Sequence, residues 1–172
     1  MHKHLSNSIL ALFLLLSLSG CRFSMNFTGG QVDTSLKTIF IDQIGNSAAL
    51  VVPFVSQDLT TSLQDQFLSR SRLSLVTENP DVILSGNVTR YTVSPTAISG
   101  GDVAAQNRLS ITVSVMYENT RDANQSWTAS KNFTGFVDFP ADADFSSQEQ
   151  EFAAEAIEQI VQKVFNETLG KW

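Results

Sequence analysis

Residues 108–119, "RLSITVSVMYEN", contain the clearest structural pattern in the chain. Apolar and polar side chains alternate along this stretch with a period of two, which is typical of a β-strand with one buried face and one exposed face. The stretch therefore predicts a long strand whose second face carries hydroxyl groups. The predicted buried side consists of Leu109, Ile111, Val113, Val115 and Tyr117, and the other side of Ser110, Thr112 and Ser114.

The segments before and after this stretch alternate in the same way. Residues 82–93 have apolar side chains mainly at even positions, and residues 126–138 have them at odd positions. Both segments are therefore predicted strands, with a turn at residues 119–125. The apolar positions are Val82, Leu84, Val88, Trp127, Ala129, Phe133 and Val137.

Shorter strands are predicted nearer the N-terminus. Residues 36–44, "LKTIFIDQI", are rich in β-branched and aromatic side chains and stop at Gly45-Asn46, and residues 72–76, "RLSLV", form a second short strand. Residues 94–107, "SPTAISGGDVAAQN", have no clear period and are a predicted loop. Loops of this length often carry function, so this loop is a candidate contact with a partner.

Two amphipathic helices complete the prediction. Residues 54–70 repeat an apolar side chain every four positions, at Val55, Leu59, Leu63 and Phe67. A C-terminal helix is predicted to begin at a capping box, Ser146 with Glu149 or Ser147 with Gln150, and to end at Gly170. Its apolar stripe consists of Phe152, Ala153, Ala156, Ile157, Ile160, Val161, Val164 and Phe165, and reaches Leu169. This order of elements predicts an α+β fold with a roughly four-stranded mixed sheet and two helices packed on one face.

The first twenty residues have the features of an export signal. Lys3 provides a basic start, an apolar window covers residues 9–18, and small residues follow it. The sequence Leu18-Ser19-Gly20-Cys21 then matches the bacterial lipobox, in which the cysteine thiol receives a diacylglycerol through a thioether. We therefore predict a signal peptide at residues 1–20, a lipidated tether at 21–35 and Cys21 as the lipidation site. The alternative is an ordinary signal peptide followed by an incidental or buried cysteine.

The predicted mature chain has 152 residues, which is the size of one domain. We place that domain at residues 36–172, after the tether. Lys3 is the only charged residue of the signal, so 10 of the 11 basic residues and all 17 acidic residues remain, giving a net charge of −7. This balance argues against nucleic-acid binding and against flat binding to an anionic membrane. Both histidines, His2 and His4, lie in the signal, which excludes histidine-based catalytic triads and ordinary zinc sites.

Few residues are candidates for chemistry. The stretch that begins at Asp142 resembles a calcium loop, but it has Ser147 where the loop needs glycine and Ala153 where it needs glutamate. We therefore expect no metal, no cofactor and no enzymatic activity. An enzyme based on carboxylates alone would need two acidic groups facing each other in a cleft, and the sequence offers no such pair.

Three basic residues are candidates for binding an anionic lipid: Arg90, Arg108 and Lys131. Arg90 and Lys131 share the apolar parity of their strands, so their stems are predicted to lie along the edge of the core. Ordinary snorkelling at strand ends, or a bulge in the strand, would account for them as well.

The polar face of the sheet is predicted to hold mostly Ser, Thr and Asn. Charged residues make up 16% of the chain, against about 25% in average soluble domains. A face of hydroxyls and amides suits contact with a polar protein lining, such as the lumen of an outer-membrane barrel. The preference of threonine for strands explains the same composition without any partner.

The chain resembles the LptE family of lipopolysaccharide-assembly lipoproteins, and within it the Bacteroidetes-type members. The resemblance rests on "SGCRFSMNFTGG", "LKTIFIDQIGNSAALV", "LTTSLQDQFLSRSRLSLV", "DVILSGNVTRYTVSPTAISGGDVAAQNRLSITVSVMYENT" and "EAIEQIVQKVFNETLGKW", and it is most specific in "YTVSP…NRLSITVSV". It implies a lipoprotein that plugs and helps to assemble the LptD barrel translocon and contacts lipopolysaccharide on its way to the outer leaflet. Arg22 after the cysteine is compatible with lipid anchoring at the periplasmic side of the outer membrane. A free periplasmic lipoprotein that binds an amphiphile or a peptide without a barrel partner remains the alternative.

Overall fold

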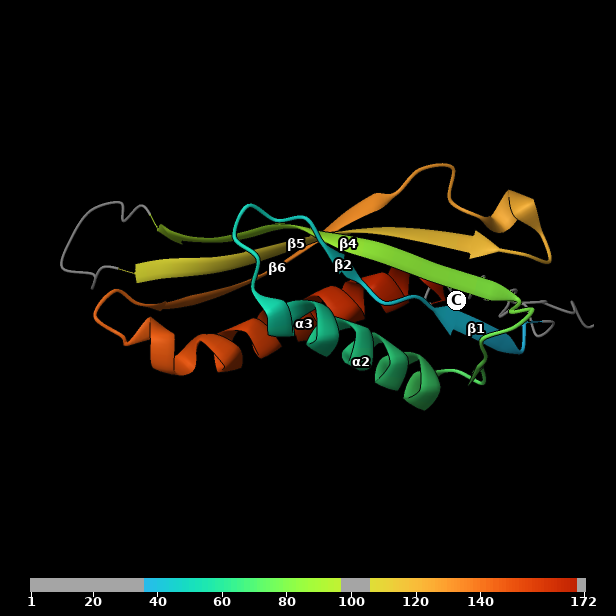
Figure 1. Ribbon diagram of the computed structural model, residues 1–172, viewed down its shortest axis with the longest axis horizontal. Coiled ribbons are helices and arrows are strands. Elements are labelled where there is room, and N and C mark those ends of the chain that lie inside the picture. The colour runs from blue at the N-terminus through green and yellow to red at the C-terminus, as the bar shows by residue number, and fades with distance from the viewer. Residues whose placement is uncertain (1–35, 97–105, 170–172) are drawn as a thin grey trace, which may run out of the picture.

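The computed structural model describes residues 36–96 and 106–169. These residues form one mixed sheet with the helices α2 (Pro53–Arg70) and α3 (Phe145–Thr168) on the same face (Figure 1). The predicted α+β class and the placement of both helices on one face are confirmed. The strand count is higher than predicted, because the described sheet has six strands instead of about four.

The strands are β1 (Thr38–Ile41), β2 (Gly45–Asn46), β3 (Ser74–Leu75), β4 (Val82–Pro95), β5 (Gln106–Asn119) and β6 (Lys131–Pro140). Their spatial order is β3-β1-β4-β5-β6, with β2 next to β4. β1 runs parallel to β3 and β4, β2 runs parallel to β4, and β4, β5 and β6 are antiparallel.

The predicted strand at residues 36–44 is shorter than expected, and the predicted break at Gly45-Asn46 was wrong. β1 ends at Ile41, and the chain then rejoins β4 as β2. The Asp42 N–H donates to the Leu84 carbonyl before this step, and the Ser47 N–H donates to the Val88 carbonyl after it. Pairing with β4 therefore determines where these short strands begin and end. The local sequence carries no information about that pairing.

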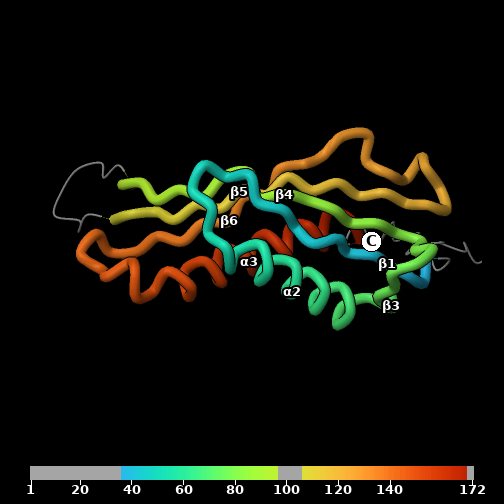
Figure 2. The backbone as a smooth tube through the Cα atoms, viewed as in Figure 1, coloured from blue at the N-terminus to red at the C-terminus, as the bar shows by residue number. Residues whose placement is uncertain are grey.

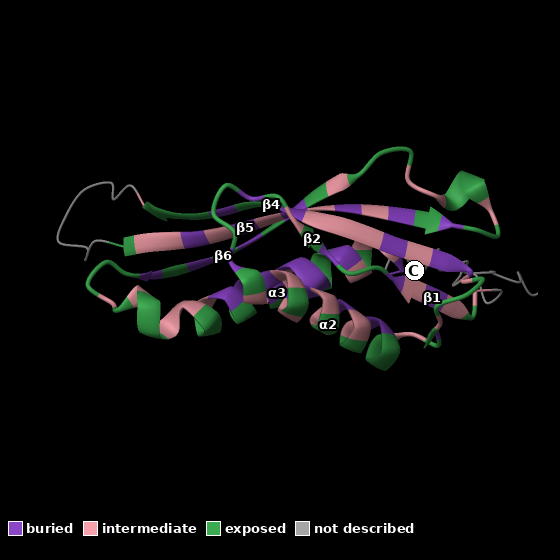
Figure 3. Ribbon diagram, viewed as in Figure 1, coloured by how far each residue is buried: buried purple, intermediate pink, exposed green. Residues whose placement is uncertain are grey.

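The alternation in β5 is confirmed along its whole predicted length. Every odd position from Leu109 to Asn119 is buried, while the even positions are partly or fully exposed. Figure 3 shows buried and intermediate residues in turn along β4 and β5. One face of β5 therefore lies on the core, and the other carries the hydroxyl groups that the sequence indicated.

β4 contains a bulge that corrects the prediction for Arg90. The register with β5 pairs Val88 with Val113 and then Arg90 with Thr112, which leaves Thr89 as the extra residue. A bulge inserts one residue and so reverses the parity of the strand beyond it. Tyr91 consequently occupies the buried position, and Arg90 is exposed on the other face.

β6 begins at Lys131, five residues later than predicted. The chain before it makes a short 3-10 helix, η1 (Ala123–Gln125), and Trp127 packs its ring on Tyr117 and Phe133 at centroid distances of 5.7 and 6.0 Å. Ala129, predicted to be buried, is exposed, because this segment covers the hairpin end and does not join the ladder. The odd parity within β6 itself is confirmed by the buried Phe133 and Val137.

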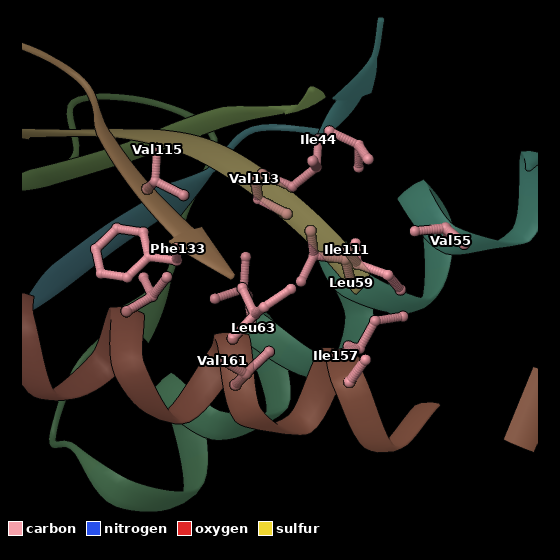
Figure 4. Packing of buried hydrophobic residues seen from close by; sticks show 14 of the residues in the cluster. Ile44, Val55, Leu59, Leu63, Ile111, Val113, Val115, Phe133, Ile157 and Val161 are labelled. Atoms are coloured by element: carbon pink, nitrogen blue, oxygen red, sulfur yellow. The ribbon is translucent and has the colours of Figure 1, made fainter. Parts of the chain in front are cut away.

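The core lies between the sheet and the two helices. Figure 4 shows side chains of β5, α2 and α3 meeting there, among them Ile111, Leu63 and Val161. The predicted α2 face is confirmed. All six α3 residues that are buried come from the predicted stripe: Ala153, Ala156, Ile157, Ile160, Val161 and Val164.

The predicted start of α3 was wrong by a few residues. The helix begins at Phe145 with Asp144 as its N-cap, and Ser146 and Ser147 lie in the first turn. Their hydroxyls donate to Asp144, at Oδ1 and at the carbonyl oxygen respectively, both at 3.0 Å. The first residue of the helix, Phe145, stacks on Phe139 of β6 at 5.3 Å between ring centroids, a tertiary contact that the local sequence does not show.

Candidate functional site: the open sheet face

The face of β4, β5 and β6 that points away from the helices is the candidate site, and we call it the open face. The helices α2 and α3 lie on the other side of the sheet (Figure 1). Directly opposed residues of the three strands form rows across this face, because cross-strand partners point to the same side. The rows are Ser94–Arg108–Asp138, Thr92–Ser110–Phe136, Arg90–Thr112–Thr134 and Asn87–Ser114–Asn132.

Hydroxyl groups occupy the middle of the open face. Thr112 Oγ1 and Thr134 Oγ1 lie 3.0 Å apart, and Thr89 Oγ1 donates to the Thr112 carbonyl at 3.2 Å. A hydroxyl both donates and accepts hydrogen bonds, and its hydrogen rotates to suit the partner. This surface can therefore bind polar groups of varied geometry without presenting a dense charge.

Arg108 is already engaged within the open face. Its Nε and Nη2 donate to the two carboxylate oxygens of Asp138 at 2.6 and 2.7 Å, and its guanidinium lies 4.1 Å from the centroid of the Phe136 ring. These hydrogen bonds lower the pKa of Asp138 and raise the pKa of Arg108. The pair is neutral as a unit, so Arg108 meets an anionic ligand only in competition with Asp138.

Arg90 differs from Arg108 because its side chain makes no ion pair or hydrogen bond with any described residue. It lies beside the Thr112–Thr134 hydroxyls and four β5 residues away from the row of Arg108, about 13 Å along the strand. Arg90 is thus the cation of the open face that a ligand can reach without displacing a partner.

Lys131 lies on the opposite side of the sheet. It pairs across the ladder with the buried Val115, its Nζ is 2.5 Å from Glu167 Oε1, and it lies 4.4 Å from the Trp127 ring centroid. The predicted apolar parity of Lys131 is confirmed. The three predicted cations therefore do not form one site, since Arg90 and Arg108 share the open face and Lys131 joins α3 to β6.

Parts of the predicted site lie outside the described residues. These parts are Cys21 with its tether, residues 97–105 of the predicted loop, and the C-terminal Gly170.

Within the described ranges, no group of three acidic, cysteine or histidine side chains is placed to hold a metal ion. No helix among the described residues combines the length and the hydropathy that crossing a bilayer requires.

Phe136 and Asp138 were missed as members of the site by reasoning from sequence. Phe136 is 40% exposed, which is unusual for a phenylalanine, and Asp138 fixes the Arg108 side chain. The signal that could have found them is the register of the hairpin, since Arg108 and Asp138 lie directly opposite each other. Opposite charges at facing positions on neighbouring strands stabilise the pair.

The outer surface of the helices has a different character. An open groove between α2 and α3 is lined by polar and apolar side chains and by the carboxylates of Asp58, Asp65 and Glu158. The uncharged hydroxyls and the free Arg90 lie on one side of the molecule, and this acidic groove lies on the other. The open face is therefore the better surface for a polar or anionic partner.

Comparison with known families gives a match over nearly all of the described chain. A family model described as LptE, lipopolysaccharide-assembly, matches residues 36–168. No curated protein sequence matches the chain.

Solved structures of similar fold include several bacterial lipoproteins. A minor lipoprotein from Acinetobacter baumannii has 16% identity and a TM-score of 0.52, with 79% of this chain and 94% of that chain covered. Lipoprotein B from Nitrosomonas europaea has 14% identity and a TM-score of 0.50, covering 78% and 83%. A protein from Xanthomonas campestris has 13% identity and a TM-score of 0.55, covering 79% and 85%. At these identities the similarity concerns the fold.

Proposed function

The chain belongs to the LptE family of lipopolysaccharide-assembly proteins, and from this premise we propose that it is the lipoprotein partner of an LptD-type barrel in the outer membrane. In this role it plugs the lumen of the barrel, helps the barrel to assemble, and assists the passage of lipopolysaccharide to the outer leaflet. The work is binding and assembly, and no catalytic step is assigned to any residue.

The observation that carries this proposal is the open face. A domain that works alone in water usually covers an exposed sheet with charged side chains, whereas this one presents mostly Ser, Thr and Asn, with Arg90 and the Arg108–Asp138 pair as the charged members of its rows. The lumen of a transmembrane barrel is polar, and hydroxyls pair with its side chains without leaving a charge buried and unpaired. We propose that the open face lies against the barrel wall.

Among the three candidate cations, we propose that Arg90 makes the direct contact with a phosphate of lipopolysaccharide. Its guanidinium has no partner among the described residues, and the Thr112 and Thr134 hydroxyls beside it can donate to the same anion. Arg108 contributes only when a ligand displaces Asp138. Lys131 is assigned to the structural contact with Glu167.

The anchor is proposed to be Cys21. Removal of residues 1–20 and lipidation of Cys21 would tether the domain at residues 36–172 to the periplasmic side of the outer membrane through residues 21–35. Stable anchoring needs more than one acyl chain, and a diacylglyceryl cysteine provides two.

A co-purification experiment tests the barrel partnership. The tagged protein, extracted in mild detergent, is expected to bring down a large barrel protein identified by mass spectrometry. Ser114→Glu, which puts a carboxylate into the row Asn87–Ser114–Asn132 of the open face, where no cation lies, is expected to reduce the recovered partner at least about tenfold, as for a charge buried without a counter-ion. Thr61→Glu on the exposed side of α2 is the matched control and is expected to retain the partner.

The outcomes separate the two functions. Wild-type protein that comes away without a barrel, while its isolated domain holds an amphiphile or a peptide, would replace this proposal with a free periplasmic binding lipoprotein. Equal loss of the partner in Thr61→Glu and Ser114→Glu would show that the open face is not the contact surface. Circular dichroism confirms that each variant is folded before the comparison.

The anchor has its own test. Intact-mass measurement of the mature protein is expected to show an N-terminal Cys21 carrying a diacylglyceryl group, and fractionation to place the protein with membranes. Cys21→Ala is expected to abolish the adduct and the mature membrane-bound form, because no other thiol exists in the chain. A free Cys21 thiol on the wild-type product would overturn the assignment.

A further inference from the structure

The outer edge of β6 is closed by side chains of α3. Among the described strands β6 pairs with β5 alone, so its other side is a free sheet edge. The Phe136 N–H donates to Gln159 Oε1 at 3.2 Å, and Gln159 Nε2 donates to the Phe136 carbonyl at 2.8 Å. One carboxamide thus makes both hydrogen bonds that a residue of a neighbouring antiparallel strand would make.

Lys163 closes the next position of the same edge. Its Nζ donates to the Thr134 carbonyl at 2.6 Å. Gln159 and Lys163 are four residues apart on a helix, about 6 Å along its axis, and Thr134 and Phe136 are two residues apart on a strand, about 6.8 Å. α3 runs beneath β6 (Figure 2), and the rise of four helix residues nearly equals the spacing of alternate strand residues. Gln159 and Lys163 therefore reach two successive outward-facing backbone positions of β6.

We propose that Gln159 and Lys163 block the β6 edge against pairing with a second copy of this chain, and that without them the protein dimerises through antiparallel β6–β6 pairing. Long unprotected edge strands associate readily, and β6 has ten residues. The inference does not depend on the proposed barrel partner, since the edge and both blocking residues belong to this chain.

A second copy fits this edge by symmetry. Centring a two-fold axis on Phe136 places Phe136 opposite its own copy and Thr134 opposite Asp138 of the second copy. Residues at alternating positions share one direction of backbone hydrogen bonding, so the groups of Thr134, Phe136 and Asp138 all point outward. The exposed Phe136 ring would then meet its symmetry mate on the open face, which covers part of an apolar surface that is 40% exposed in one copy.

The test measures self-association of the chain from Arg22 to Trp172, which retains every described residue. Sedimentation equilibrium is expected to show a monomer for the wild type and at least about tenfold tighter self-association for Gln159→Ala/Lys163→Ala. Gln162→Ala is the matched control on the same helix, because its amide contacts Gln66 and Asn166 and not the strand. Gln159→Asn/Lys163→Met provides a milder pair in case the alanine pair does not fold.

Adding Thr134→Pro to the Gln159 and Lys163 variants tests whether the dimer forms through the β6 edge. Proline is tolerated at an edge strand where its nitrogen faces outward, and it removes one N–H that the new pairing needs. The dimer is expected to revert to monomer. A folded blocking-residue variant that stays monomeric at every concentration, or a dimer that survives Thr134→Pro, would overturn the proposal.

Discussion

Gly135→Ala is expected to lower the free energy of unfolding by about 3 kcal/mol, the upper part of the range for overpacking. A Cβ at this position would lie 2.0 Å from the carbonyl oxygen of Ala156 and 2.8 Å from its carbonyl carbon. Both atoms belong to the backbone of α3, so no side-chain rotation relieves the clash. The helix has to move away from β6, which loosens the contacts of the buried α3 stripe along the sheet.

Urea unfolding followed by circular dichroism measures this loss. Gly45→Ala is the matched control because it adds the same methyl group, and the nearest atom is the side-chain oxygen of Asn87 at 2.7 Å, which a rotation can move. The control is expected to lose no more than about 1 kcal/mol. Equal losses in the two variants would show that α3 does not lie directly on the β6 backbone.

Asp81→Ala is expected to destabilise the fold by about 3 kcal/mol. The Asp81 carboxylate is buried and accepts hydrogen bonds from the backbone N–H groups of Lys37 (2.8 Å) and Thr38 (3.1 Å) and from Arg121 Nε (2.5 Å). It thereby joins the start of β1 to the start of β4. Removing it leaves two N–H groups without their acceptor, and each such loss costs about 1–3 kcal/mol.

The same carboxylate makes stability depend on pH. Hydrogen bonds from Lys37 and Arg121 lower the pKa of Asp81 from 3.8 to about 2. Because the pKa is depressed in the folded state, the stabilisation is fully present above about pH 4 and is lost as the pH falls towards 2. The stability advantage of wild type over Asp81→Asn should therefore shrink by about 2 kcal/mol between pH 5 and pH 2.

Asp65→Asn provides the control for the pH series. Asp65 is exposed on α2, and the substitution removes the same charge without breaking a buried contact. Its stability is expected to stay within about 0.5 kcal/mol of the wild type at pH 7. A constant difference between wild type and Asp81→Asn across this pH range would show that the carboxylate is not held by the β1 backbone.

The candidate site was predictable only in part. The hydroxyl-rich face followed from the alternation in residues 108–119, since a period of two assigns each side chain to one side of a strand. The prediction for Arg90 was wrong because the bulge at Thr89 depends on the pairing of β4 with β5. Arg108 was identified, but its neutralisation by Asp138 depends on the register of β5 with β6.

The sequence by itself determined the buried faces of α2, α3, β5 and β6, and of β4 as far as its bulge, because helical and strand periodicities are properties of neighbouring residues. It also indicated the α+β class and the family resemblance. Only the tertiary structure decided that Gly45-Asn46 pairs with β4, that Gly135 touches α3, and that Gln159 closes the β6 edge. Each of these contacts joins residues about twenty or more positions apart in the sequence. It depends on spacing, register and the close approach of backbones, which no local pattern contains.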